Sequence, residues 1–369
     1  MSEFASLARS VPSLASKSSR VAIKPTLHAG FGVFAAIDLE PGSPVLRFDR
    51  PVAYTIFRTF RREVCAHCFA YNLGQYWKIK DLRYGVVFCT AECQQAWLDR
   101  HPPLAREAFS ALESFIQLRA RKDSDIIKSE RIAFGAGFSP DVDEITEAWR
   151  SVHDRAALII SRRLSDLSTS TKAQRRALQE ALQLPIDDTD IIYFVLSGII
   201  SHLTSPSLWS SLESVAPNPR PYTSKTALLS TTYAYLQLLA ILPTELLPFT
   251  TPAIIHGLMA RDACNSFGIW SGTGSRDGDE FLGYGIWPDA SFFNHSCQPS
   301  VTKTRVGQGW EFSSTLRRVV AKDDELCISY LGEEEDKMSV VERRKKLWNG
   351  WGFECMCPKC NSEAAIARN

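Results

Sequence analysis

Seven of the ten cysteines in this sequence fall into two short groups, and this grouping limits the fold more than any other feature. No secretory signal is visible, so C-x-x-C and C-x-C spacings predict reduced thiolate ligands of a metal ion rather than disulfides. We therefore expect a reducing compartment, the cytoplasm or the nucleus. The groups are Cys65, Cys68, Cys89 and Cys93, followed much later by Cys355, Cys357 and Cys360.

The first group predicts one structural zinc ion. Cys65 and Cys68 can bind Zn²⁺ from a tight turn, and Cys89 and Cys93 can do so from the first turn of a helix. Four thiolates complete a tetrahedron and leave no position for water or substrate, so the metal is expected to be structural. Four unlinked core thiols are the alternative, but they do not explain the spacing. The second group offers three ligands, so its metal requires a fourth from elsewhere.

Length and charge exclude some classes of protein. A chain of 369 residues is long enough for two or three domains with a well-buried core. Its 42 basic and 41 acidic residues give a formal charge of +1, so no overall basic field favours nucleic acid. Apolar stretches such as 191–200 are shorter than the roughly 18 residues that cross a bilayer, so no membrane span is expected.

The first 24 residues are rich in serine and carry Arg9, Lys17, Arg20 and Lys24 against a single acid, Glu3. This is the composition of an organelle transit peptide. A frayed, solvated tail is the alternative, because a folded segment is expected to begin near residue 21 and leaves little to cleave.

Four stretches carry a resemblance to a known family. Taken together and in this order, they resemble the SET-domain lysine methyltransferases, specifically the SMYD type, in which a MYND zinc finger interrupts the SET domain. The stretches are HAGFGVFAA (28–36), SFFNHSCQPSV (291–301), ELCISYLG (325–332) and GWGFECMCPKC (350–360).

The first cysteine group resembles a degenerate MYND finger. The middle C-x-x-C pair and the final cysteine of the family pattern are missing, so one of its two zinc sites is expected to be lost. His67 and His101 are then expected to be ordinary polar residues rather than ligands.

The resemblance implies an α+β fold, in which small SET sheets with a pseudoknot carry the inserted finger, a large helical insertion and a zinc-binding post-SET segment. We expect the short form, without the C-terminal helical repeat domain of many SMYD-type proteins. The expected segments are a flexible tail (1–20), the N-terminal SET part (21–60), the finger (61–101), the helical insertion (102–255), the SET core (256–335) and the post-SET segment (336–369).

Apolar residues at helical spacing predict several helices in the insertion, which is long enough for its own core to make it a separate subdomain. The stretches 204–224 and 271–280, rich in serine, proline and glycine, predict surface loops. The predicted helices span 106–119, 173–184, 190–203, 223–242 with a cap at Thr223, and 252–262 after Thr251.

The resemblance implies S-adenosylmethionine as the cofactor. The turn at Gly30, Phe31 and Gly32 would wrap its methionine end, since glycine permits close backbone approach; an ordinary hairpin turn is the alternative. Asn294 would meet the amino acid end and His295 the adenine edge. The family pattern also places Phe353 on the adenine face and Asn265, with Phe267, close to the cofactor, where a plain helix-to-strand junction is the alternative.

In SMYD-type proteins the cysteine of NHSC joins the post-SET cysteines around one zinc ion. Here that implies Cys297 as the fourth ligand, which would fasten the C-terminal tail over the cofactor site. Two structural zinc ions are therefore expected in all. Cys264 and Cys327 remain as buried, inert thiols.

The resemblance implies Tyr330 as the catalytic residue, in a strand-like run whose alternation places Leu326, Ile328 and Tyr330 on one face. A core tyrosine is the alternative. The reaction would be attack by a neutral lysine amine on the methyl group of a sulfonium, with the tyrosine and carbonyl oxygens positioning the amine.

Two hypotheses about function follow. The first is a protein-lysine methyltransferase with a histone or non-histone protein as substrate, and the second is a catalytically silent, zinc-stabilised interaction module with the same fold. A zinc hydrolase is disfavoured because both metal sites are expected to be closed.

Overall fold

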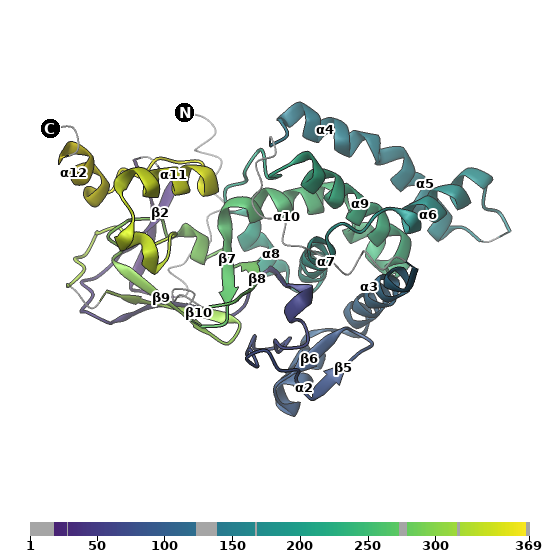
Figure 1. Cartoon of the computed structure of the whole chain (residues 1–369), viewed down its shortest axis with the longest axis horizontal. Helices are drawn as coiled ribbons and strands as arrows, with labels where there is room; N and C mark the ends of the chain where they lie inside the picture. Colours follow the sequence, from purple (N-terminus) through teal and green to yellow (C-terminus); the bar gives the residue numbers. More distant parts are fainter. Residues whose placement is uncertain are drawn as a thin grey trace.

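The computed structural model describes residues 18–27, 29–122, 139–166, 168–272, 279–315 and 318–366. Strands gather at one end of the molecule, the helices of the middle region at the other, and a small hairpin with its helix projects below (Figure 1). The strands are β1 (Val21–Pro25), β2 (Phe31–Ala35), β3 (Pro44–Phe48), β4 (Ala53–Ile56), β5 (Ile79–Asp81), β6 (Val86–Phe88), β7 (Ser266–Trp270), β8 (Phe281–Ile286), β9 (Val301–Val306) and β10 (Gly309–Ser314).

The described strands form four small antiparallel sheets, two of which join segments from both ends of the chain. β1 pairs with β2 and β5 with β6, while the three-stranded sheets have the orders β3-β10-β9 and β4-β8-β7. Early strands thus pair with strands that follow more than two hundred residues later, and everything between them is inserted. The expected α+β fold with small sheets is confirmed.

The strand-like segment 325–330 does not form a regular strand. It is extended, with Leu326 and Ile328 buried as the alternation required, but it makes only isolated bridges, Phe34 to Glu325 and His295 to Ile328. The physical reason is that its two neighbours differ: Leu326 N–H donates to Val33 O, whereas Ile328 N–H donates to Asn294 O. A late segment therefore lies between the early hairpin and the 294–301 loop, which is how the knot-like part of the fold is held.

The five predicted helices are confirmed, within a few residues at their ends. α9 begins one residue later than expected, because the Ser224 hydroxyl, and not Thr223, accepts from Ala227 N–H. The helices are α2 (Ala91–Arg100), α3 (Pro103–Lys122), α4 (Val142–Ser151), α5 (His153–Leu164), α6 (Lys172–Gln183), α7 (Thr189–Thr204), α8 (Pro206–Glu213), α9 (Lys225–Ile241), α10 (Pro252–Asn265), α11 (Val340–Trp351) and α12 (Pro358–Ile366).

The loop predicted over 204–224 is partly wrong, because it contains α8. Pro206 starts this helix, and Trp209 and Leu212 bury its inner face, which outweighs the polar composition of the stretch. α4, α5, α11 and α12 were not predicted either. Capping boxes at Asp141 and Ser339 were readable signals for α4 and α11. In the second predicted loop, residues 273–278 lie outside the described residues.

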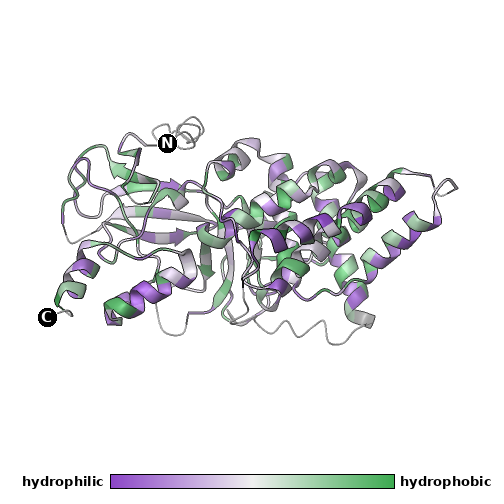
Figure 2. Ribbon diagram, turned by 90° about the horizontal axis from the view of Figure 1, so that it is seen from above, coloured by the Kyte–Doolittle hydropathy of each residue, from purple (hydrophilic) through white to green (hydrophobic). Residues whose placement is uncertain are grey.

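Among its described residues, the helical insertion shares its core with the finger. Its buried residues, such as Leu196 and Leu238, belong to one continuous apolar cluster with Phe88 and Trp97 of the finger. A second cluster fills the strand-bearing end, and Figure 2 shows apolar and polar residues mixed along the helices around the first. Among the described residues no single helix is long and apolar enough to span a membrane; the pair α7 and α8 passes by length and composition but bends by 117°.

Candidate active site and metal centres

The first cysteine group forms a compact cluster in the finger. Cys65 and Cys68 lie in a turn, Cys89 follows β6, and Cys93 lies in the first turn of α2, whose cap is Thr90. The Sγ atoms of Cys68 and Cys89, and of Cys89 and Cys93, are 3.5 Å apart. All four Sγ atoms lie within 4.8 Å of one another. A tetrahedral zinc with Zn–S bonds of about 2.3 Å sets sulfurs about 3.8 Å apart, so the cluster fits one zinc ion.

The thiols of this cluster differ in acidity. Hydrogen bonding by the Cys68 thiol lowers the pKa of Cys65, which favours the thiolate form of this ligand. Burial raises the pKa of Cys89 to about 11. A bound metal ion supplies the charge that deprotonates the remaining thiols.

The two histidines near the finger lie outside the cluster. His101 is buried between Trp97 and Phe109, with ring centroids at 4.3 and 5.6 Å, and its Nδ1 lies 2.8 Å from Trp97 O. Burial lowers the pKa of His101 to about 4, so the ring is neutral. His67 Nδ1 is buried without a hydrogen-bond partner. Neither side chain contributes to the group of four thiols.

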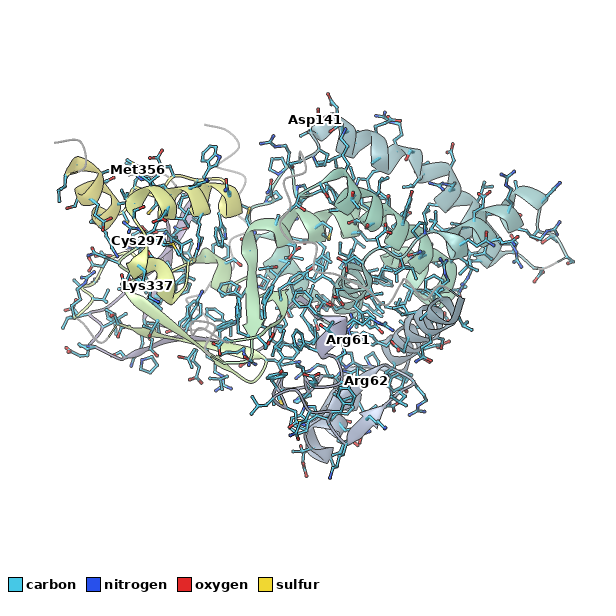
Figure 3. The ribbon with its side chains drawn as sticks, viewed as in Figure 1. Arg61, Arg62, Asp141, Cys297, Lys337 and Met356 are labelled. Carbon is cyan, nitrogen blue, oxygen red and sulfur yellow. The ribbon has the colours of Figure 1, made fainter. Side chains whose placement is uncertain are left out.

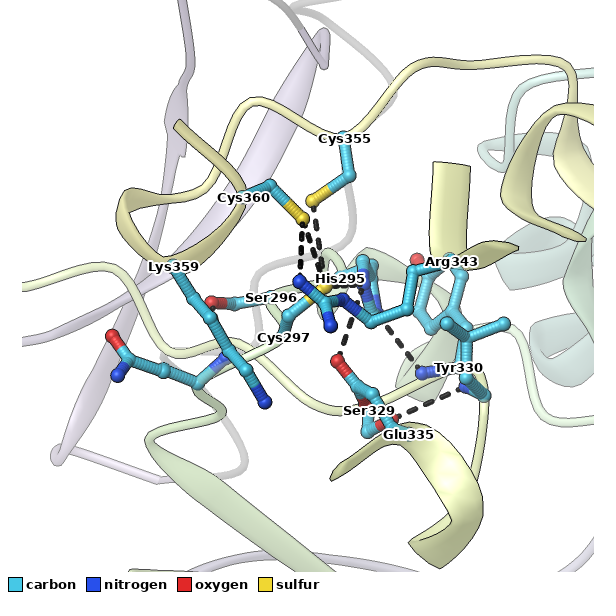
Figure 4. Close-up of polar contacts among 12 residues, drawn as sticks. His295, Ser296, Cys297, Ser329, Tyr330, Glu335, Arg343, Cys355, Lys359 and Cys360 are labelled. Atoms are coloured by element: carbon cyan, nitrogen blue, oxygen red, sulfur yellow. Dashed lines mark hydrogen bonds and ion pairs between the residues drawn. The ribbon is translucent and has the colours of Figure 1, made fainter. Parts of the chain in front are cut away.

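The second cysteine group finds its fourth member in Cys297. The Sγ atoms of Cys297, Cys355, Cys357 and Cys360 all lie within 4.8 Å of one another. Cys297 Sγ is 3.8 Å from that of Cys355 and 3.4 Å from that of Cys360, again the spacing of a tetrahedral zinc site. Figure 4 shows the tail approaching the 294–301 loop through these sulfurs, and Figure 3 places Cys297 beneath the segment that carries Met356. Hydrogen bonds from Cys297 and Cys355 lower the pKa of the Cys357 thiol.

Two residues that sequence reasoning missed support this cluster. Arg343 of α11 is 1% exposed and donates from Nη2 to Cys360 Sγ at 3.6 Å and to Glu363. Its cation offsets the negative charge of four metal-bound thiolates. Glu335, also buried, accepts from Ser329 Oγ and has its second oxygen 3.9 Å from His295 Nε2. Neither residue belongs to a sequence motif that distinguishes it from an ordinary charged residue on the surface, so the sequence carried no signal for either.

His295 connects the metal cluster to Tyr330. Its side chain is fully buried, its Nδ1 accepts from Tyr330 N–H at 3.1 Å, and its Nε2 lies 3.3 Å from Cys297 Sγ. Burial lowers the pKa of His295 to about 4, so the ring is neutral and its single proton lies on Nε2, facing Cys297 Sγ. The predicted role at an adenine edge concerns backbone groups and stays a prediction.

Tyr330 lies at the junction of the sheets and the tail. Its hydroxyl donates to Phe293 O at 3.0 Å, and its ring centroid is 5.2 Å from Trp351 and 6.3 Å from Phe353. The Phe353 ring is also 6.1 Å from His295, so the structure brings these predicted residues together. Burial raises the pKa of Tyr330, which keeps the phenol protonated.

Asn294 ties the glycine turn to the segment before Tyr330. Its Nδ2 donates to Phe31 O at 3.1 Å and to Glu325 Oε1 at 2.8 Å. Gly30, at φ +70°, is part of the hairpin turn between β1 and β2. A Cβ on Gly32 would lie 2.5 Å from Glu325 Oε1 and 2.8 Å from Asn294 Nδ2. The stretch is thus a hairpin turn that is also closely packed, and Glu325 is a further polar residue that sequence reasoning missed.

We expect Gly32→Ala to destabilise the protein by about 1–3 kcal/mol, because the added methyl group must displace a carboxylate and an amide held together by a hydrogen bond. Thermal unfolding of the purified variant measures this. Gly350→Ala is the control: nothing lies within 4 Å of a Cβ there, and alanine is favoured by up to about 1 kcal/mol inside a helix such as α11. An unchanged unfolding temperature for Gly32→Ala would contradict the packing described.

In the described structure, the Asn265 side chain makes no polar contact with Gly32, Asn294 or Tyr330. Its Nδ2 donates to Arg261 O at 2.8 Å and to Ala216 O at 3.4 Å, at the junction of α10 and β7, and its closeness to the cofactor stays a prediction. Cys264 and Cys327 are partly exposed rather than buried. Burial of the sulfur still raises both pKa values, that of Cys327 to about 12, so both thiols stay protonated at neutral pH.

Comparison with known proteins decides the family. The family model described as SET domain matches residues 30–331, which is most of the chain and includes the glycine turn, Asn294 and Tyr330. The chain belongs to the SET-domain family. The knot-like contact between the 325–330 segment and the 294–301 loop, and the paired ends of the chain, are therefore the organisation of a SET domain around its insertions.

Three relatives show how far the likeness extends. The potential protein lysine methyltransferase SET6 of Saccharomyces cerevisiae is 24% identical, over 92% of this SET-domain chain and 95% of its own length. The histone-lysine N-methyltransferase SMYD3 of Mus musculus is 23% identical over 92% of this chain and 60% of its own. A SET and MYND domain-containing protein of Dictyostelium discoideum is 36% identical over 30% of this chain and 25% of its own. The finger cluster accordingly fits a MYND-like zinc finger.

Proposed function

We propose that this protein is a methyltransferase that moves a methyl group from S-adenosylmethionine to the ε-amine of a protein lysine. The SET family and the methyltransferase names of the yeast and mouse relatives support the reaction class. The observation that carries the proposal is the convergence of the glycine turn, Asn294 and Tyr330 beneath a tail fastened by Cys297.

The residues present fit the cofactor. Phe31 O and the Glu325 carboxylate both accept from Asn294 Nδ2 beside Gly32, and as acceptors they match the ammonium group of the cofactor. The ring of Phe353, 6.1 Å from that of His295, offers a face for adenine. When bound, the cofactor supplies an electrophilic methyl group on a sulfonium.

The residues around Tyr330 prepare the acceptor amine. A solvated lysine has a pKa near 10.4 and is almost entirely charged at pH 7, so an apolar, water-poor site that lowers this pKa frees the lone pair. The Tyr330 hydroxyl, held by Phe293 O, can accept a hydrogen bond from that amine and fix its direction. Both cysteine clusters are closed sets of four thiolates, so the zinc ions they would hold stabilise structure and take no part in the reaction.

The test combines transfer and binding. Purified protein given cofactor with a labelled methyl group and a cell extract should label lysines of extract proteins. Asn294→Ala should weaken cofactor binding, measured by calorimetry, by about tenfold, because the variant loses an oriented amide and frees the Glu325 carboxylate.

Asn349→Ala, an exposed asparagine of α11, is the matched control and should bind normally. If the cofactor binds but no extract or peptide library is labelled, the silent interaction module becomes the better description. Equal affinities for wild type and Asn294→Ala would remove Asn294 from the proposed site.

A further inference from the structure

Lys303 has an unusual position for a lysine on a surface strand. On β9, Thr302 and Thr304 are exposed, while Lys303 and Arg305 turn inward. The strand lies beside β10 at the sheet-bearing end, where Figure 1 shows it below the C-terminal helices. Arg305 reaches Trp270 O, at the far end of β7, with Nη2 at 2.9 Å. Lys303 instead points toward the residues around Tyr330.

The amine of Lys303 is held by a carbonyl and an aromatic ring. Its Nζ donates to Ser329 O at 3.1 Å, the carbonyl directly before Tyr330. It also lies 5.5 Å from the centroid of the Phe267 ring, which packs against Trp310 and Phe312. Among the described residues no carboxylate forms an ion pair with Lys303, so a carbonyl dipole and a π face compensate poorly for lost water.

This environment is what an acceptor lysine needs. Burial lowers the pKa of Lys303 to about 8. About one molecule in ten then carries a neutral amine at pH 7, against about one in a thousand or less for a solvated lysine. The carbonyl that accepts from Lys303 Nζ belongs to the residue directly before Tyr330, so the geometry places the amine beside this segment.

We propose that Lys303 is an internal acceptor, whose ε-amine takes a methyl group from a sulfonium donor bound to the same chain. The inference rests on the proposed function and names one substrate of that site. The amine lone pair forms the new N–C bond as the C–S bond breaks; the sulfur keeps the bonding pair and becomes a thioether, and the methylated amine releases a proton to water. The donor is S-adenosylmethionine, the cofactor class already proposed.

The test uses the full chain without any other protein. Wild type incubated with S-adenosylmethionine carrying a labelled methyl group should acquire label, and peptide mass spectrometry should place it on Lys303. The fraction labelled per unit time should not change with protein concentration, since each chain modifies itself. Lys303→Arg should lose this label, whereas Lys322→Arg, an exposed lysine on the turn before Glu325, should keep it.

The outcomes separate this inference from the proposed function. If extract proteins are labelled but Lys303 is not, the inference is wrong and the methyltransferase assignment stands. If neither extract proteins nor Lys303 are labelled, both the inference and the methyltransferase assignment are wrong. A fraction of Lys303 labelled per unit time that rises with protein concentration would show transfer between molecules and overturn an internal acceptor. Because wild type alone gives these results, they hold even if Lys303→Arg folds poorly.

Discussion

Tyr330→Phe should lower the rate of methyl transfer by about a hundredfold or more while the protein stays folded. The hydroxyl is buried beside Phe293 O, and no other side-chain hydroxyl of the described residues bonds to that carbonyl. Removing one preorganised polar contact from a water-poor reaction site costs about 3 kcal/mol in the transition state. Single-turnover transfer to extract proteins, with cofactor affinity measured separately, checks this.

The control must separate chemistry from stability. Loss of the Tyr330 hydroxyl leaves Phe293 O without its donor, which costs about 1–3 kcal/mol of folding free energy. Tyr222→Phe makes the same change in the helical region, where the hydroxyl accepts from Trp149 Nε1 at 3.2 Å. The two variants should unfold at similar temperatures, and only Tyr330→Phe should lose transfer. A Tyr330→Phe enzyme within a few-fold of wild type would refute the catalytic assignment.

Cys297→Ser should reduce bound zinc from two ions to one and abolish most cofactor binding. Cys297 is the member of its cluster that belongs to the 294–301 loop, so its loss releases the tail that carries Phe353 and α12. A structural zinc site is worth about 10 kcal/mol or more to the structure it closes. Buried Arg343 then keeps Glu363 as its partner but loses part of the negative charge of the thiolate cluster.

Metal analysis, thermal unfolding and calorimetry with the cofactor measure these losses. Cys264→Ser is the matched control, because this thiol belongs to neither cluster and contacts Asn218 at 3.5 Å. It should retain both zinc ions and bind cofactor normally. Two ions and an unchanged affinity in Cys297→Ser would mean that the tail is held without this cluster.

Metal ligands and helix ends were predictable because their chemistry is local. Three cysteines within six residues require a fourth ligand whatever the fold, and the family motif named Cys297, which the structure places beside them. Thr251 followed by Pro252 likewise predicted the start of α10. Such signals depend on bond geometry over a few residues, so tertiary structure rarely overrides them.

The loop prediction over 204–224 shows the opposite case. Serines and prolines there indicated a loop, but Trp209 and Leu212 gain more by packing on the helical core than the polar residues lose. The 325–330 run likewise has the alternation of a strand, while its hydrogen bonds go to two different partners. The apolar periodicity of a segment indicates which of its residues are buried, but it does not indicate which elements they pack against.

By itself, the sequence determined the two thiolate clusters, the family and the position of Tyr330 in the chain. Only the tertiary structure decided that Glu325 accepts from Asn294, that Arg343 donates to the second cysteine cluster, and that the amine of Lys303 donates to Ser329 O. The reason is physical: an isolated Glu, Arg or Lys looks like solvated surface charge in a sequence. Its role depends on water being excluded by elements that are distant along the chain.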